Sequence, residues 1–215
     1  MRSSAINGGS LAKMIFDRVV SAIALIVLAP LMLAIAAWIK LSSLSSPGPV
    51  LFRQVRIGKD ARPFTLLKYR SMAPGADRLA GNVTPRGDPR VTRVGRTLRR
   101  WYLDELPQLV NVLRGDMSLV GPRPETPEFV AELLPHERKV LEVKPGLVGA
   151  STLAFMHEAD LLAESEDPAT YYRTTLLHER VLCDLEYLSR QSLLTDIAVL
   201  VSQVVAIFWP RQRTP

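Results

Sequence analysis

Residues 19–39 read VVSAIALIVLAPLMLAIAAWI, and these 21 positions contain no charged side chain. At about 1.5 Å per residue, a helix of this length covers roughly 30 Å, the thickness of the hydrocarbon core of a bilayer. Pro30 lies near the centre, where a proline removes one backbone hydrogen bond and clashes with the preceding turn. The sequence therefore predicts a membrane helix that is kinked or broken at Pro30.

The topology of this apolar segment is constrained by basic residues on both of its flanks. Lys13 and Arg18 precede it, and Lys40 and Arg53 follow it. Because basic flanks favour the cytoplasmic side, a re-entrant hairpin bent near Pro30 would satisfy both ends. A kinked helix that crosses the bilayer once is the alternative, and these residues leave both open. A signal peptide fits less well, since the apolar segment is long and starts only after 18 residues.

The composition indicates one folded domain with anionic partners. The chain has 215 residues, of which 47% are hydrophobic and 22% charged, and this excludes a disordered or low-complexity chain. Lys and Arg number 27 against 21 Asp and Glu, a net charge of +6. Nucleic acid, phosphorylated small molecules and acidic lipid headgroups are all compatible with this charge. The single cysteine, Cys183, excludes an internal disulfide and a thiolate metal cage.

A second apolar stretch lies near the C-terminus, at residues 197–209, and is followed by arginines. It is too short to span a bilayer securely. Trp209 at its end and the basic residues beyond it are typical of a helix that lies in the membrane interface. A buried core helix is the alternative that the residues leave open.

A β-hairpin is predicted after the N-terminal apolar segment. Residues 50–57 and 64–71 form two short β-like runs, and residues 58–60 between them have turn composition. The period of two places four side chains of the second run on one face, namely Phe64, Leu66, Lys68 and Arg70. Two cations therefore project side by side, either towards an anion or towards solvent.

An arginine-rich strip follows the hairpin. Residues 86–100 contain six arginines and one acid, Asp88, at near-helical spacings. Aromatic residues are not interleaved, and no helix-turn-helix or zinc-finger pattern accompanies the strip, so lipid or sugar-nucleotide phosphates fit better than nucleic acid. A solvated basic face is the other explanation.

The run DELPQLVNVLRG, residues 104–115, has the pattern of a short helix. Its apolar residues recur at helical spacing, at Leu106, Leu109, Val110 and Leu113. We expect the helix to begin at Asp104 and Glu105 and to stop at Gly115. The positive end of a helix lowers the pKa of a carboxyl group, so Asp104 would be ionised and available as a nucleophile, and Glu105 could hold a hard cation. Asp104 as a simple N-cap is the alternative.

The next motif is Gly121-Pro122-Arg123-Pro124-Glu125. The flanking prolines fix the backbone around Arg123, so its guanidinium could grip a phosphate in bidentate fashion with little ordering cost. A rigid surface loop is the alternative interpretation. The chain contains neither a P-loop nor a dinucleotide-binding glycine motif.

Four features together resemble the bacterial sugar transferases known as monotopic phosphoglycosyl transferases. They are the apolar segment with its central proline, LKYRSM at 67–72, DELPQ at 104–108 and GPRPE at 121–125. The resemblance runs from about Ile15 to the C-terminus, and it implies the minimal catalytic form of the family. It implies a mainly α fold with a small β-hairpin, a proline-broken re-entrant N-terminal helix at Pro30 and interfacial amphipathic helices.

The resemblance also implies an activity. Such enzymes transfer a sugar 1-phosphate from a nucleoside diphosphate sugar, typically a UDP-sugar, to polyprenyl (undecaprenyl) phosphate and release nucleoside monophosphate, which is the first membrane step of surface-glycan assembly. The matching aspartate, Asp104, would form a covalent phosphosugar intermediate, and Glu105 with Asp104 would hold Mg²⁺. Arg123 would bind substrate phosphate, and Lys68, Arg70 and Arg100 are added to that site.

The implied organisation has three parts in one folding unit. Residues 1–45 form the membrane segment, 46–192 the cytosolic catalytic body, and 193–215 the interface helix with a basic tail. The expected location is the cytoplasmic face of the bacterial inner membrane, with membrane lipid but no nucleic acid as partner, and a homodimer is compatible. A rival class is a non-enzymatic membrane-attached protein that binds acidic lipid or nucleic acid through its arginine strip.

Two positions depart from the family pattern. Ala29 precedes Pro30 where serine is frequent, so the proline must account for more of the helix break. Residues 144–153 keep the proline-glycine turn but lack a glutamine that is often found soon after it, so the sugar is not indicated.

Overall fold

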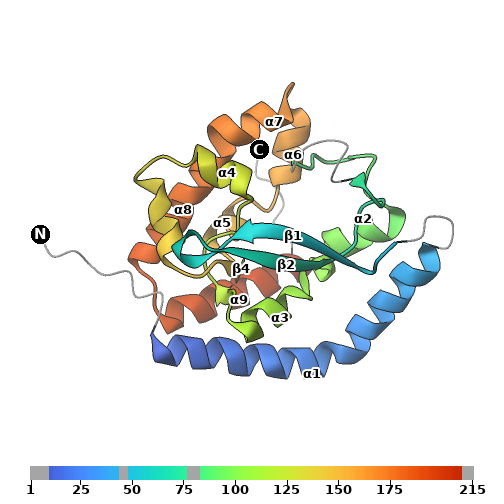
Figure 1. Ribbon diagram of the computed structural model, residues 1–215, viewed down its shortest axis with the longest axis horizontal. Coiled ribbons are helices and arrows are strands. Elements are labelled where there is room, and N and C mark those ends of the chain that lie inside the picture. Colours follow the sequence, from blue (N-terminus) through green and yellow to red (C-terminus); the bar gives the residue numbers. More distant parts are fainter. Residues whose placement is uncertain (1–9, 44–47, 77–82, 210–215) are drawn as a thin grey trace, which may run out of the picture.

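Helices make up most of the protein, and two small sheets complete it (Figure 1). The computed structural model describes residues 10–43, 48–76 and 83–209. In chain order the elements are α1 (Leu11–Ser42), β1 (Leu51–Ile57), η1 (Lys59–Ala61), β2 (Pro63–Tyr69), α2 (Arg93–Arg100), η3 (Leu103–Glu105), α3 (Gln108–Arg114), β3 (Ser118–Val120), α4 (Pro127–Glu132), η4 (Glu137–Glu142), β4 (Gly146–Val148), α5 (Ala150–Ala154), α6 (Glu158–Glu164), α7 (Pro168–Tyr171), η5 (Tyr172–Leu176), α8 (Leu177–Ser189) and α9 (Leu193–Phe208). The predicted mainly α fold with a small hairpin is confirmed.

Helix α1 is one continuous helix of 32 residues that contains Pro30. It bends part-way along its length, as Figure 1 shows. The expectation of a broken helix is therefore wrong in its strict form, because a long helix can lose one hydrogen bond at a proline and still continue with a kink. The re-entrant path through a membrane stays a prediction.

Helix α1 differs from a soluble amphipathic helix, because it buries polar side chains in its first turns and exposes most of its large apolar side chains, although Ile35 and Ile39 near its other end are buried. Lys13, Asp17 and Ser21 are buried, whereas large apolar side chains are exposed at Leu11, Ile15, Val19, Ile23, Ile26, Val27, Leu31, Leu33, Trp38 and Leu41. A helix in water buries its apolar stripe. An outward apolar face with inward polar groups is expected where lipid covers the outside. By its length, and by the mean hydropathy of 2.8 over its most apolar 18 residues, α1 would also suffice to cross a membrane.

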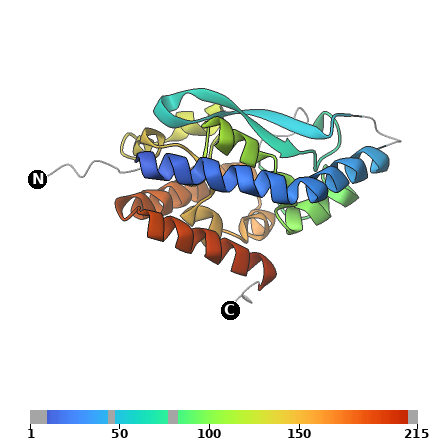
Figure 2. The ribbon, with the colours of Figure 1, turned by 90° about the horizontal axis from the view of Figure 1, so that it is seen from below.

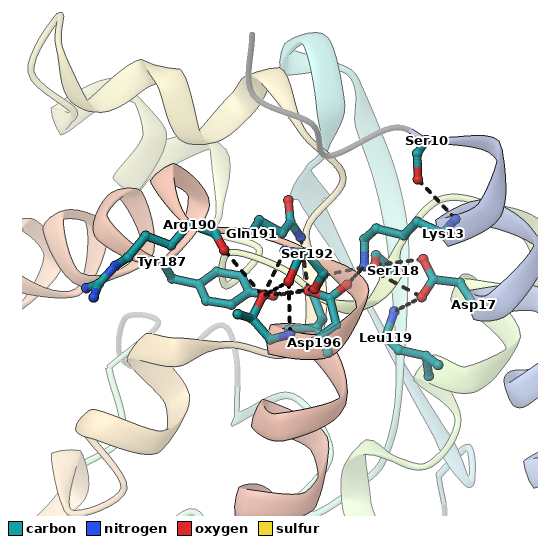
Figure 3. Close-up of polar contacts among 12 residues, drawn as sticks. Ser10, Lys13, Asp17, Ser118, Leu119, Tyr187, Arg190, Gln191, Ser192 and Asp196 are labelled. Atoms are coloured by element: carbon teal, nitrogen blue, oxygen red, sulfur yellow. Dashed lines mark hydrogen bonds and ion pairs between the residues drawn. The ribbon is translucent and has the colours of Figure 1, made fainter. Parts of the chain in front are cut away.

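A buried polar network fastens the first turns of α1 to the body (Figure 3). The ammonium of Lys13 pairs with Asp196 of α9, and the hydroxyl of Tyr187 donates to the same carboxylate. Asp17 Oδ2 accepts a hydrogen bond of 2.8 Å from Ser118 Oγ on β3. Because Lys13, Asp17 and Asp196 are each at most 5% exposed, these contacts are shielded from water and hold α1, β3 and α9 together.

The C-terminal apolar stretch forms α9, which is not a buried core helix. Its large apolar side chains are exposed at Leu194, Ile197, Val201, Val204, Val205 and Phe208, while Asp196 and Gln203 are buried. Helices α1 and α9 lie on the same side of the molecule, as the view from below in Figure 2 shows. The predicted basic tail at 210–215 lies outside the described residues.

Two sheets carry the sequence motifs. In the antiparallel β1–β2 hairpin, Leu51 pairs with Tyr69 and Ile57 with Pro63. The parallel pair β3–β4 was not predicted, and it joins the GPRPE segment to the segment at 144–153 through a 2.8 Å hydrogen bond from Gly146 N to Pro122 O. A Cβ at Gly121 would lie 2.6 Å from a backbone carbonyl, so the close approach requires glycine there.

Three apolar clusters support these elements. One joins α1, β2, α3 and β3 around Leu66, Val112 and Leu119. The second joins the later part of α1 to α2 through Ile39 and Leu98. The third packs α4, η4, α6, η5 and α8 and contains Phe129, Leu162, Tyr172, Leu176 and Leu177. Strands β2 and β3, which adjoin the LKYRSM and GPRPE motifs, contribute Leu66, Tyr69 and Val120 to these clusters.

Candidate active site

A cavity of about 650 Å³ opens beside the β-hairpin and collects most of the charged residues singled out in the sequence. Eight cationic and three acidic side chains line it, namely Arg53, Arg56, Lys68, Arg70, Arg90, Arg99, Arg123 and Arg180 with Asp104, Glu105 and Glu158. This volume is typical of a site for a small molecule. The excess of positive charge favours a polyanionic ligand.

The two acids at 104 and 105 lie on a short turn before helix α3. Tyr102 has a left-handed backbone with φ of 55°, and the 3₁₀ turn η3 carries both acids into the cavity wall. Helix α3 begins only at Gln108, with Pro107 as its N-cap. The prediction that the helix starts at the acids is therefore wrong, and so is the alternative that Asp104 is its N-cap. The backbone N–H of Glu105 donates a hydrogen bond of 3.2 Å to Tyr102 O, and this i to i+3 bond is typical of a 3₁₀ turn.

The ionisation of these acids is set by burial and by nearby cations. Burial raises the pKa of Asp104, which is 7% exposed, and this is opposite to the shift predicted from a helix terminus. Burial also opposes ionisation of Glu105, but the charges of Lys68 and Arg123 hold its pKa below its usual range. The environment thus separates the pKa values of two adjacent carboxyl groups, as in many sites with divided roles.

Lys68 faces Glu105 across the gap between β2 and η3. Its Nζ donates a hydrogen bond of 2.7 Å to Glu105 Oε1. The alignment depends on Asn111 of α3, which is fully buried and binds the main chain of β2. Its Nδ2 donates to Thr65 O at 2.8 Å, and its Oδ1 accepts from Leu67 N at 3.1 Å. Asn111 was not singled out in the sequence. Its place among the apolar residues of the predicted helix would have indicated that it binds a buried main chain.

The predicted arginine strip does not form one continuous surface. Arg99 points to the cavity, and its Nε donates to Ser71 Oγ at 2.9 Å. Arg100 is exposed, lies 5.7 Å over the ring of Trp101 and does not line the cavity. Successive helical residues differ by about 100° in direction, so only one of the neighbouring pair can face the site. The structure brings Arg99 to the site in place of the predicted Arg100.

The Arg70 side chain also lines the cavity. It is 8% exposed, and its Nη2 donates to Ser43 Oγ just after α1. The structure therefore brings together five of the predicted site residues, namely Lys68, Arg70, Asp104, Glu105 and Arg123. Pro30 lies apart from them within α1.

The Arg123 loop is held from behind by helix α8. The backbone N–H of Arg123 donates to Asp184 Oδ2 at 3.2 Å, and the same oxygen accepts 2.8 Å from Ser151 Oγ. Glu125, next but one in the chain, accepts a 3.0 Å bond from Tyr172 OH. Burial raises the pKa of Asp184. This support was not predicted from the sequence. An acid among apolar residues at helical spacing, as Asp184 is among Leu177, Val181 and Leu188, would have indicated it.

A divalent metal fits the acids by donor chemistry. Among the residues that the structure describes, no group of three or more His, Cys, Asp or Glu could hold a metal. Asp104 and Glu105 both line the cavity, and Mg²⁺ is commonly bound by one or two carboxylates together with substrate phosphates and water. A site of this kind would be completed by an anionic substrate.

Sequence comparison identifies the family of the chain. Residues 8–210 match the bacterial sugar transferase family. The chain belongs to this family. Membership makes it a transferase and disfavours the rival class of a non-enzymatic binding protein.

Several relatives carry specific names. A UDP-glucose:undecaprenyl-phosphate glucose-1-phosphate transferase of Caulobacter vibrioides is 38% identical over 200 residues, covering 92% of this chain and 70% of that protein. An exopolysaccharide production protein of Rhizobium leguminosarum is 37% identical, with 90% of this chain and 94% of that protein covered. A UDP-N-acetylgalactosamine-undecaprenyl-phosphate N-acetylgalactosaminephosphotransferase of Aeromonas hydrophila is 44% identical over 67% of this chain. The chain spans only 34% of that last protein, and similarly small shares of several other relatives.

Proposed function

We propose that this bacterial sugar transferase moves a sugar 1-phosphate from a UDP-sugar to undecaprenyl phosphate and releases UMP. The observation that carries the proposal is the placement of Asp104 in a cavity with eight cationic side chains, beside Glu105 and its partner Lys68. A diphosphate needs cationic neighbours, and a nucleophile needs a place among them. The names of the relatives support the substrate classes.

The first half-reaction uses Asp104 as nucleophile. A carboxylate oxygen of Asp104 forms a bond to the phosphorus that carries the sugar. The bond from that phosphorus to the bridging oxygen breaks, and the electron pair leaves with UMP. An aspartyl phosphosugar remains on the enzyme. The charges of Lys68 and Arg99 favour the ionised form of Asp104 and so oppose the effect of its burial.

The second half-reaction regenerates the carboxylate. A phosphate oxygen of undecaprenyl phosphate attacks the same phosphorus, and the bond to Asp104 breaks. The products are undecaprenyl diphosphate sugar and free Asp104, so atoms and charge balance over the cycle. This would be the initiating step of surface-glycan biosynthesis.

Glu105, with Asp104, would hold Mg²⁺. When bound, the ion would neutralise negative charge on the transferring phosphate. Lys68 orients Glu105 through its 2.7 Å hydrogen bond. Arg123, fixed by the Asp184 contact, presents its guanidinium to a phosphate oxygen. These residues bind and orient the diphosphate so that one phosphorus faces Asp104.

The body would lie on the cytoplasmic face of the inner membrane. Exposed apolar residues on α1 and α9, on one side of the molecule, support a protein embedded in one leaflet, with α1 re-entrant and α9 in the interface. A lipid acceptor requires a site that opens close to the membrane.

The test is a two-stage reaction with the full chain in lipid nanodiscs. Incubation with UDP-glucose or UDP-N-acetylgalactosamine alone should release about one equivalent of UMP and add the mass of a hexose or N-acetylhexosamine phosphate at Asp104. Undecaprenyl phosphate should then remove the added mass. Chelation of divalent metal should stop both stages, and Mg²⁺ should restore them. Turnover without any adduct when acceptor is omitted would contradict the covalent route, and no UMP release with any UDP-sugar would contradict the function.

A further inference from the structure

Arg180 is a buried cation in the cavity wall that the proposed chemistry has not used. It lies on α8, one turn before Asp184, and is only 3% exposed. Its Nε has no hydrogen-bond partner among the described residues, and its charge is paired with Glu158 of helix α6. Both Arg180 and Glu158 line the 650 Å³ cavity together with Asp104. A buried guanidinium with unused donors is costly unless a ligand completes its hydrogen bonds.

The charge environment of Arg180 favours an additional anion. Arg123 lines the same cavity and a small adjoining pocket with Arg180, and the two guanidinium charges disfavour each other. Burial together with the charge of Arg123 lowers the pKa of Arg180 to about 10. The nearby carboxylate of Asp184 is already used by Ser151 and by the backbone of Arg123. The charges of Glu125 and Glu105 also favour the ionised form of Arg180, but these acids pair with Arg56 and Lys68. Glu158 is therefore the counter-ion that can be exchanged without dismantling the Arg123 loop.

We propose that the carboxylate of Glu158 binds Arg180 at the position that a substrate phosphate takes, and that the diphosphate of the nucleotide sugar displaces this carboxylate when it binds. This inference rests on the proposed function, since it names the occupant of the same cavity. Arg123 and Arg180 then bind the diphosphate as a pair. Exchange of one anion for another keeps Arg180 neutralised in both states, so the buried charge is never left alone.

The fold allows this exchange as a movement of one side chain. Helix α6 is fixed at the residues next to Glu158, because Arg86 N donates 2.7 Å to Ala159 O and the Arg86 guanidinium pairs with Asp160 at 2.9 Å. The helix can therefore stay in place while the Glu158 side chain leaves Arg180. Before the substrate binds, Glu158 also keeps the cavity less cationic, which disfavours other small anions.

The experiment measures the affinity of UDP for the full chain in nanodiscs by isothermal titration calorimetry, with and without Mg²⁺. Glu158→Gln removes the competing charge and should tighten UDP binding about threefold or more. Arg180→Gln should weaken it about tenfold or more, with partial rescue in Arg180→Lys. Glu186→Gln and Arg190→Gln are matched controls, because this exposed pair lies at the far end of α8, and they should leave the affinity unchanged.

The outcomes separate this inference from the function it rests on. Wild-type protein that binds UDP, with Glu158→Gln and Arg180→Gln binding equally well, would overturn the exchange while leaving the transferase proposal in place. Weaker binding by Glu158→Gln would also overturn it, because Glu158 would then be a ligand of the nucleotide. Wild-type protein that neither binds UDP nor releases UMP from any UDP-sugar would instead overturn the proposed function. Because Arg180 is buried, the melting temperature of each variant is compared, and Glu158→Gln tests the exchange even if Arg180→Gln does not fold.

Discussion

The ammonium nitrogen of Lys68 lies 2.7 Å from Oε1 of Glu105, in a pair whose side chains are about one-fifth exposed. The pair joins the β-hairpin to the turn that carries the nucleophile. The positive charge of Lys68 favours the ionised forms of both Asp104 and Glu105, and so acts against the effect of burial on their pKa values. One lysine therefore supports both the geometry and the ionisation of the two acids.

Replacement of Lys68 should move the acid limb of the profile of rate against pH to higher pH. In Lys68→Met the pKa values of Asp104 and Glu105 rise, so both acids take up protons at a higher pH and activity is lost earlier as the pH falls. The free energy of unfolding at neutral pH should drop by about 1–2 kcal/mol, because the partly buried Glu105 loses its hydrogen-bonded partner. Rate profiles from pH 5 to 9 and urea unfolding measure the two effects. Lys68→Arg, which keeps the charge, should retain the wild-type limb, and an unmoved limb in Lys68→Met would contradict the assignment.

Asp104→Asn should remove activity without loss of stability. The rate should fall about 1,000-fold or more, since the amide cannot form the phosphosugar adduct. Burial raises the pKa of Asp104 in the folded state, so its ionisation destabilises the fold at neutral pH and this penalty disappears below its unfolded pKa. The melting temperature of the variant should therefore equal or exceed that of wild type at pH 7.5, with the difference vanishing near pH 4. A large stability loss at pH 7.5 would mean that Asp104 is structural.

The sequence predicted the local elements better than their relative placement. The hairpin, the helix ending at Gly115 and the apolar segments follow from periodicity and from turn residues, which act over a few positions. The parallel pairing of β3 with β4 joins segments about 28 residues apart in register, from Ser118 to Gly146, and no local pattern encodes it. The direction of the Asp104 pKa shift was missed for the same reason, because burial depends on the whole fold.

The choice of site residues also depends on packing that the local sequence does not specify. Arg99 and Arg100 are adjacent in the sequence, and only the packing of α2, through Val94 and Leu98, decides which one faces the cavity. Gly95 allows this packing, since a Cβ there would lie 1.8 Å from Ser71 O. The Asp184 and Arg180 contributions come from a helix about 60 residues after Arg123, beyond any motif.

Asn111 should prove to be a stability residue. In Asn111→Ala the backbone N–H of Leu67 and the carbonyl of Thr65 lose their partners in a buried setting, so the free energy of unfolding should fall by about 2–4 kcal/mol. Leu113→Ala on the same helix is a matched control, because its side chain is 39% exposed, and should cost about 1 kcal/mol. Urea unfolding of the detergent-solubilised chain compares the two. Equal losses would show that Asn111 does not fasten α3 to β2.

The bend in α1 bears on the topology of the protein in the membrane. A helix with Pro30 near its middle can enter and leave one leaflet, and basic residues on both flanks favour the same cytoplasmic side. Pro30→Leu restores the missing hydrogen bond and should straighten α1, so that its N-terminus moves to the periplasmic side. The readout is labelling of Ser3→Cys by a membrane-impermeant maleimide in whole cells, in a Cys183→Ser background. Val27→Leu, an exposed apolar change one turn earlier, is the control and should stay unlabelled like the parent. Labelling of the parent from outside would refute the re-entrant path and favour a helix that spans the bilayer.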